Sequence, residues 1–266
     1  MQPLTLRLIQ TQTHWHDPEA NRTMFDRWFC EVPESADVVV LPEMFSTGFT
    51  MNSDSVAEPM SGPTVVWLSA ASAALNKVVC GSLVIVENGF HYNRFLWATP
   101  DGELGVYDKR HLFRMAGEHN HYKAGSERLV LTVGDWKICP MVCYDLRFPV
   151  WFRNRDDYDV LLCVANWPAA RREAWSALLR ARAIENLSYS LGVNILGEDG
   201  NSVSYRGGTS AYTPEGEVLI QAGDQAGIFT VELDKEYLDR YRAAFPAGQD
   251  ADTYYLADER EPIDRP

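Results

Sequence analysis

Basic residues are scarce in this sequence of 266 residues: 24 Lys and Arg stand against 37 Asp and Glu, a formal net charge of −13. A nucleic-acid binder needs a basic face that displaces counterions from phosphates, so we expect no nucleic-acid partner. Internal repeats and low-complexity segments are also missing. With a hydrophobic fraction of 46%, the composition is that of an ordinary globular protein.

Long hydrophobic runs are absent as well. The longest, Val38–Leu41 and Val160–Ala165, are far shorter than the roughly 20 apolar residues that cross a bilayer. The first residues also lack the basic region and apolar stretch of an export signal. We therefore expect a cytoplasmic protein without a membrane partner.

Cysteines are few and odd in number, and none has CxxC spacing, which argues against a disulfide framework and a zinc site. They are Cys30, Cys80, Cys139, Cys143 and Cys163. His119 and His121 form an HxH pair, but third and fourth ligands at zinc-like spacing are missing. We expect no metal, and reduced thiols of which one is a candidate for chemistry.

Apolar periodicity predicts strands that alternate with helices. The expected strands cover residues 4–9, 37–41, 78–86, 91–98, 104–107, 129–133, 136–142, 160–166, 187–195, 209–213, 217–220 and 227–233. The expected helices cover residues 17–30, 62–76, 149–155 and 171–186. This order predicts an α/β fold of mixed sheets with helices outside. Because no linker stands out, we expect one domain over residues 1–260 and a tail over residues 261–266.

Three polar side chains follow the carboxyl ends of predicted buried strands, where active sites of α/β proteins usually lie. They are Glu43, Lys109 and Cys143. A carboxylate can take the proton of a thiol, and an ammonium group lowers the pKa of a thiol and stabilises a tetrahedral oxyanion. Together the three groups predict acyl transfer through a thioester.

The segments around these residues resemble the three signatures of the nitrilase, or carbon–nitrogen hydrolase, superfamily. They are Leu41–Phe45, Tyr107–Phe113 and Val142–Pro149. Further matches follow in order along the chain: Gly117-Glu118, Asn166-Trp167-Pro168, residues 180–186, Gly200-Asn201 and residues 207–210. The resemblance implies a four-layer α-β-β-α sandwich of the nitrilase type, a homodimer, and no metal or organic cofactor.

Within the superfamily the sequence looks most like the omega-amidase branch, which hydrolyses the terminal amide of 2-oxoglutaramate and 2-oxosuccinamate. The resemblance implies that Glu43 is the general base, Lys109 the oxyanion-binding cation and Cys143 the nucleophile. Glu118 would be a second carboxylate that holds Lys109 and helps position the amide or the water. The backbone N–H of Tyr144 would complete the oxyanion hole.

Aromatic residues beside the motifs are expected to line the substrate pocket: Phe45, Tyr144 and Trp167. For Arg147 two interpretations stay open, a structural pair with Asp145 or a contact with a substrate carboxylate. His111 is expected to orient its loop. Because an anionic substrate must meet local cations in so acidic a protein, the candidates are Lys109, Arg147 and Arg206.

Two alternatives to an omega-amidase remain. The same triad serves other branches of the superfamily, such as deaminated glutathione amidases, N-carbamoyl amide hydrolases and nitrile hydrolases, so the triad alone does not choose the substrate. A catalytically inactive binding or scaffold protein is the other alternative, although the intact Glu43, Lys109 and Cys143 argue against it.

Overall fold

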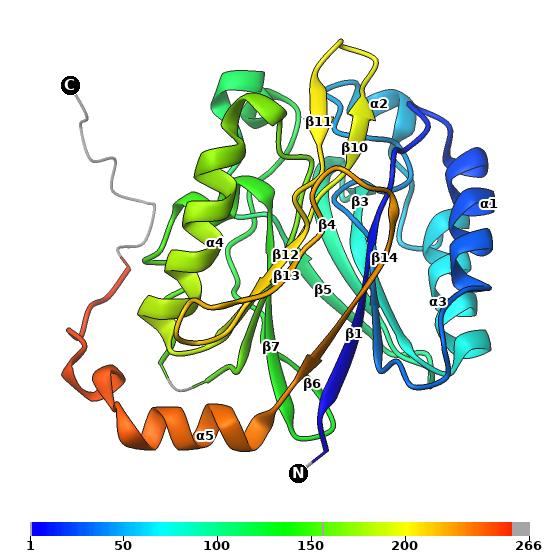
Figure 1. Ribbon diagram of the computed structural model, residues 1–266. Helices are drawn as coiled ribbons and strands as arrows, with labels where there is room; N and C mark the ends of the chain where they lie inside the picture. Colours follow the sequence, from blue (N-terminus) through cyan, green and yellow to red (C-terminus); the bar gives the residue numbers. More distant parts are fainter. Residues whose placement is uncertain (1, 156, 257–266) are drawn as a thin grey trace, which may run out of the picture.

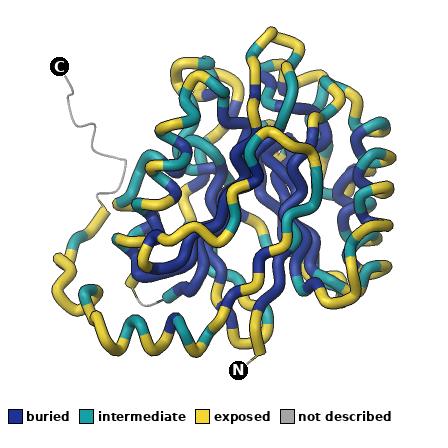
Figure 2. The backbone as a smooth tube through the Cα atoms, viewed as in Figure 1, coloured by how far each residue is buried: buried dark blue, intermediate teal, exposed yellow. Residues whose placement is uncertain are grey.

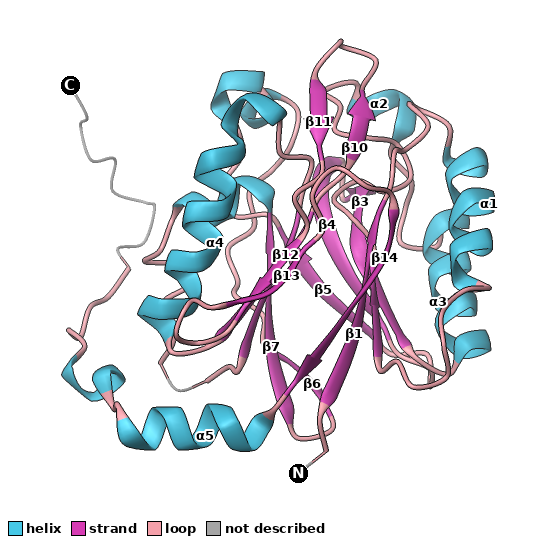
Figure 3. Cartoon of the chain, in the orientation of Figure 1, coloured by secondary structure: helices cyan, strands magenta, loops and turns pink. Residues whose placement is uncertain are grey.

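The computed structural model describes residues 2–155 and 157–256. Two six-stranded mixed sheets pack face to face, with α1 and α3 outside one sheet and α4 outside the other (Figure 1, Figure 3). This arrangement confirms the expected α/β sandwich. The predicted tail, residues 261–266, lies outside the described residues. None of the helices in the described part of the chain is long and apolar enough to span a membrane.

The first sheet has the order β14-β1-β2-β3-β4-β5, and its central β1, β2 and β3 run parallel. Its strands are β1 (Leu4–Gln10), β2 (Val38–Val40), β3 (Val78–Glu87), β4 (Phe90–Ala98), β5 (Leu104–Asp108) and β14 (Gly227–Leu233). The second sheet has the order β13-β12-β9-β8-β7-β6, with β7, β8 and β9 parallel. Its strands are β6 (Leu131–Val133), β7 (Trp136–Val142), β8 (Val160–Val164), β9 (Tyr189–Val193), β12 (Ser210–Tyr212) and β13 (Val218–Gln221).

The central strands β2, β8 and β9 are buried along their whole length because both faces of their sheets are covered (Figure 2). In β2, Val38 and Val40 face the cluster that joins the two sheets, whereas Val39 faces the cluster under α1 and α3. Successive side chains of a strand point to opposite faces, so a uniformly apolar run fits this position. The carboxyl ends of the parallel strands consequently meet at one edge of the sandwich.

Three of the helices, α1, α3 and α4, begin and end close to the predicted residues. The helices are α1 (Pro18–Phe29), α2 (Ser53–Val56), α3 (Pro63–Leu75), α4 (Arg172–Asn186) and α5 (Lys235–Ala244). Asp17 caps α1 by accepting a 2.9 Å hydrogen bond from the Ala20 N–H, with Pro18 at the first helical position. Helix α4 ends where Leu187 adopts a left-handed conformation with φ 48°, so β9 begins at Tyr189 rather than at the predicted Leu187.

One predicted helix is wrong: residues 149–152 form turns and residues 153–155 irregular backbone. Side-chain hydrogen bonds from Asn154 hold this segment, because its Nδ2 donates to the carbonyls of Tyr158 and Asn186. The elements that were not predicted include α2, α5 and the hairpin formed by β10 (Leu196–Glu198) and β11 (Ser204–Arg206). The hairpin stands at the edge where the parallel strands end (Figure 1).

Candidate active site

Two strand ends and a short 3-10 helix bring Glu43, Lys109 and Glu118 into one buried group. Glu43 follows β2 and Lys109 follows β5, while Glu118 begins the short 3-10 helix Glu118–Asn120. The Lys109 ammonium lies 2.9 Å from Glu43 Oε1 and 3.0 Å from both oxygens of Glu118. All three side chains are fully buried. One cation therefore serves two carboxylates, and the group as a whole carries one negative charge when all three are ionised.

Two asparagines fix the Glu43 carboxylate. Asn93 Nδ2 donates to Glu43 Oε1 at 2.8 Å, and the Asn166 backbone N–H donates to Oε2 at 2.7 Å. Asn93 itself is held because its Oδ1 accepts a hydrogen bond from Ser82 Oγ. The carboxylate is thus oriented before any substrate arrives.

Cys143 begins the 3-10 helix Cys143–Arg147 directly after β7, with a positive φ of 48°. A non-glycine residue rarely adopts this left-handed conformation, and such strain is typical of functional sites. The sulfur lies 3.9 Å from the backbone oxygen of Asn166, the residue that also contacts Glu43. The bend turns the side chain out of the sheet, so that it reaches the cavity.

Burial and the nearby Glu43 carboxylate raise the pKa of the Cys143 thiol well above its ordinary value. The positive charge of Lys109 offsets only part of this increase. Lys109 thus lowers the thiol pKa, as expected from its charge, but burial and Glu43 outweigh this effect. Burial disfavours the ammonium form of Lys109, yet Glu118 and Glu43 outweigh burial and raise its pKa well above normal. Burial raises the pKa of Glu118 against the opposing effect of Lys109. The resting site holds a protonated thiol beside an ammonium ion.

A third buried carboxylate, Asp145, supports the turn that carries Cys143. It accepts hydrogen bonds from the Tyr107 hydroxyl, the Val142 N–H and both the backbone N–H and Nδ1 of His111. The ring of His111 also stacks on Phe148 at 4.0 Å. The proposed pairing of Asp145 with Arg147 is wrong: the Arg147 guanidinium lies 4.9 Å from the centre of the Trp167 ring instead.

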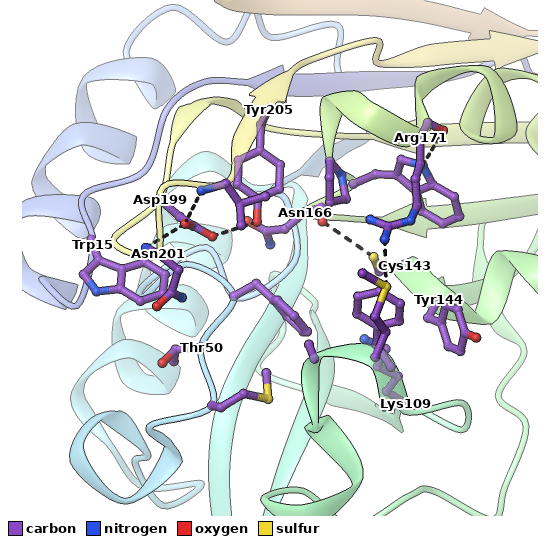
Figure 4. A pocket seen from close by; sticks show the side chains of 18 of the residues that line it. Trp15, Thr50, Lys109, Cys143, Tyr144, Asn166, Arg171, Asp199, Asn201 and Tyr205 are labelled. Carbon is purple, nitrogen blue, oxygen red and sulfur yellow. Dashed lines mark hydrogen bonds between the residues drawn. The ribbon is translucent and has the colours of Figure 1, made fainter.

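A cavity of about 610 Å³ opens above Cys143 (Figure 4). Tyr144, Arg147 and Trp167 line it as expected. Phe45 does not, because its ring is fully buried between Phe25 and Trp67 beneath α1 and α3. Arg206 is exposed and borders a separate small hollow with Arg172, so it is not a cation of this cavity.

Several wall residues were not predicted from the sequence. Figure 4 shows Trp15, Asp199, Asn201 and Tyr205 on the side of the cavity opposite Tyr144 and Arg171. The β10–β11 turn packs closely against the Trp15 indole, so a Cβ at Gly200 would lie 2.2 Å from the indole nitrogen. Of the missed residues, Asn93 carried the clearest signal, since it is the one amide side chain in β4.

His119 and His121 are both exposed. Within residues 2–155 and 157–256, no group of three or more His, Cys, Asp or Glu side chains is arranged to hold a metal ion.

The carbon–nitrogen hydrolase family model matches residues 5–243. The chain is 46% identical to omega-amidase YafV of Escherichia coli (strain K12), over 96% of this chain and 100% of that protein. It is 30% identical to 2-oxoglutaramate amidase of Bacillus subtilis (strain 168), over 92% of this chain and 96% of that protein. A solved CN-hydrolase superfamily protein from Xanthomonas campestris, with an arsenic adduct in its active site, matches with a TM-score of 0.95 at 43% identity, covering 97% of this chain and 100% of that one.

Proposed function

The chain belongs to the carbon–nitrogen hydrolase family, and we propose that it is an omega-amidase. It hydrolyses the terminal amide of 2-oxoglutaramate and of 2-oxosuccinamate to the 2-oxo dicarboxylic acid and ammonia. The observation that carries this proposal is the buried Glu43–Lys109–Glu118 group beside Cys143 at the base of a cavity. The names of the two similar amidases support the choice of substrate.

Acylation begins when Glu43 takes the proton of the Cys143 thiol and the sulfur attacks the amide carbon. The electron pair of the carbonyl moves to oxygen, where Lys109 and the backbone N–H of Tyr144 stabilise the negative charge. When the carbonyl re-forms, the carbon–nitrogen bond breaks, and Glu43 returns the proton to nitrogen. Ammonia leaves and a Cys143 thioester remains.

Deacylation uses the same carboxylate. Glu43 accepts a proton from water as the oxygen of the water adds to the thioester carbon. Collapse of the second tetrahedral intermediate breaks the carbon–sulfur bond, and the proton returns to sulfur. Glu118 keeps Lys109 in place throughout, because it holds the ammonium through both of its oxygens.

The substrate lies in the cavity between Tyr144 and Trp167, and Arg147 binds its distant carboxylate. This chemistry needs no metal or organic cofactor. We further propose that the protein is cytoplasmic and forms a homodimer through the outer face of α4.

The test is to supply the purified protein with 2-oxoglutaramate, glutamine and a simple nitrile, and to follow ammonia release. We expect release from 2-oxoglutaramate and none from the Cys143→Ala protein, which serves as the blank. Full activity of Cys143→Ala would contradict the mechanism. Release only from the nitrile, or from none of the three, would contradict the omega-amidase assignment.

A further inference from the structure

Arg171 is a cation on the cavity wall whose guanidinium meets no carboxylate among the described residues. It lies over the Phe113 ring at 5.5 Å from the ring centre, and its Nη2 is 2.8 Å from the sulfur of Met115. The backbone of Arg171 is fixed, since its N–H donates to the Pro168 carbonyl and its carbonyl accepts from Trp167 Nε1. The side chain is therefore held at the cavity but has no ionic partner there.

The buried arginines among the described residues, Arg94 and Arg182, are paired with carboxylates, and so is the half-buried Arg242. Arg94 contacts Asp108 and Glu87, Arg182 contacts Glu185, and Arg242 contacts Asp159. Desolvating a charge without a partner is unfavourable, so the half-buried Arg171 guanidinium on the cavity wall is suited to bind an anion that enters the cavity. Arg147, the other arginine of the cavity, likewise has only the Trp167 ring as its described partner.

The remaining charges of the cavity are already engaged. Lys109 is held by Glu43 and Glu118, so its charge is not available to the distant end of a substrate. Asp199 on the opposite wall accepts hydrogen bonds from the backbone of Asn201 and Val203 and from the Tyr205 hydroxyl. An incoming carboxylate therefore meets Arg147 and Arg171 as the unpaired cations of the described cavity wall.

Trp167 places these two arginines on neighbouring parts of the wall. Its ring lies under the Arg147 guanidinium, and its Nε1 holds the Arg171 backbone. Asn194 fixes the backbone of Trp167 in turn. Its Oδ1 accepts a hydrogen bond from the Trp167 N–H, and its Nδ2 donates one to the Trp167 carbonyl. Planar guanidinium groups that rest on aromatic rings are suited to bidentate binding of a carboxylate.

We propose that Arg171 is a specificity-determining residue that binds the substrate carboxylate together with Arg147. The inference rests on the omega-amidase function and sharpens it: the preferred substrates are amides that carry a carboxylate at the far end of a short chain. A neutral amide lacks the anion that the two guanidiniums bind. Glutamine is disfavoured because its α-ammonium would place a like charge beside them.

The variant Arg171→Gln tests this, with Arg172→Gln as a matched control. Arg172 is the next residue and carries the same charge, but it borders the separate small hollow rather than the cavity. Activity is compared on 2-oxoglutaramate, glutaramate, which lacks the keto oxygen, and neutral butanamide. In Arg171→Gln we expect kcat/KM for the two anionic amides, relative to butanamide, to fall roughly ten- to hundredfold, mainly through KM. Arg172→Gln should leave this ratio of kcat/KM values unchanged. Arg171→Lys, which keeps the positive charge, should lower the ratio less than Arg171→Gln does.

A binding measurement separates this inference from the proposed activity. Glutarate, a dianion, should protect Cys143 from alkylation by iodoacetamide, and half-protection should need about tenfold more glutarate in Arg171→Gln. Absence of protection in the unmodified protein, or equal shifts in Arg171→Gln and Arg172→Gln, would overturn the role of Arg171. If glutarate protects through Arg171 but no omega-amide is hydrolysed, the anion site stands and the omega-amidase function fails.

Discussion

At the scale of single residues, Glu43 and Lys109 act on the Cys143 thiol in opposite directions. Burial and Glu43 raise its pKa, whereas Lys109 lowers it. Glu43→Gln removes one cause of the increase and leaves Lys109 in place. We therefore expect the thiol to titrate at lower pH in Glu43→Gln, while turnover is lost because both chemical steps need the carboxylate. The ultraviolet absorbance of the thiolate against pH, with Cys143→Ala subtracted, measures this. An unchanged or higher thiol pKa would contradict it.

Asn93 is a positioning residue, because it holds Glu43 Oε1 at 2.8 Å and Glu118 Oε1 at 3.3 Å. Removing its amide in Asn93→Ala lets both carboxylates shift. We expect kcat to fall by up to about 10²-fold with a small change in KM, since displacement of a catalytic group affects the reaction more than binding. Steady-state kinetics on 2-oxoglutaramate measure kcat and KM separately. Tyr92→Phe, at the adjacent position of β4, is the control; an equal loss there would indicate general damage to the strand.

The sequence predicted the site residues that are tied to motifs, and it failed where packing decides. Glu43, Lys109 and Glu118 lie within hydrogen-bond distance, as their motifs imply, although their catalytic roles stay predictions. Phe45 shares a motif with Glu43 but packs into the core under α1 and α3, and Met44 between them has a left-handed φ of 42°. The position of Arg171 depends on Trp167, four residues earlier, and on Phe113, which is distant in sequence and meets it only in the fold.

At the scale of elements, periodicity predicted the central strands because both of their faces are buried. It missed α5, whose single fully buried residue, Leu238, leaves little apolar pattern to detect. Polar contacts dock this helix instead. Arg242 bonds Asp159 Oδ1 and the carbonyls of Leu187 and Tyr158, and Lys235 also contacts Asp159. Such long-range pairings cannot be deduced from local sequence.

Arg242→Ala should therefore loosen α5. It leaves the buried Asp159 with fewer partners and removes the hydrogen bonds to two carbonyls. We expect the free energy of unfolding to fall by about 2 kcal/mol, since hydrogen bonds to charged groups contribute about that much. Urea denaturation measures the change. Arg240→Ala, an exposed position of the same helix, should cost little; a similar loss in both variants would mean that helix propensity rather than docking is responsible.

At the scale of the whole molecule, the negative net charge of the chain does not prevent anion binding, because the unpaired cations lie at the cavity. The formal charge of −13 belongs to the whole chain, whereas Arg147 and Arg171 border the cavity. We expect added salt to raise KM for 2-oxoglutaramate more than for butanamide, since screening weakens attraction between partly exposed charges. The single-domain boundary at residue 260 stays a prediction, because the structure describes the chain only to residue 256.

The last prediction concerns the proposed homodimer. Ile184 of α4 contacts the turn at Gly216, and beyond this turn β13 exposes Val218 and Leu219. Because successive side chains of a strand point to opposite faces, one of these two lies on the α4 side of the sheet, where a second copy of the chain would cover it together with Ile184. We expect a solution mass of twice 30.1 kDa, and dissociation in Ile184→Glu, which places a charge in the interface.

Val66→Glu is the matched control for this variant. Val66 is an equally aliphatic and even more exposed residue, but it lies on α3 at the opposite side of the sandwich (Figure 1). Light scattering after size-exclusion chromatography should find Val66→Glu dimeric and Ile184→Glu monomeric. A monomeric unmodified protein would refute the dimer. Dissociation in Val66→Glu alone would instead assign the interface to the α1 and α3 face, because an added charge disrupts the dimer only where the two copies are in contact.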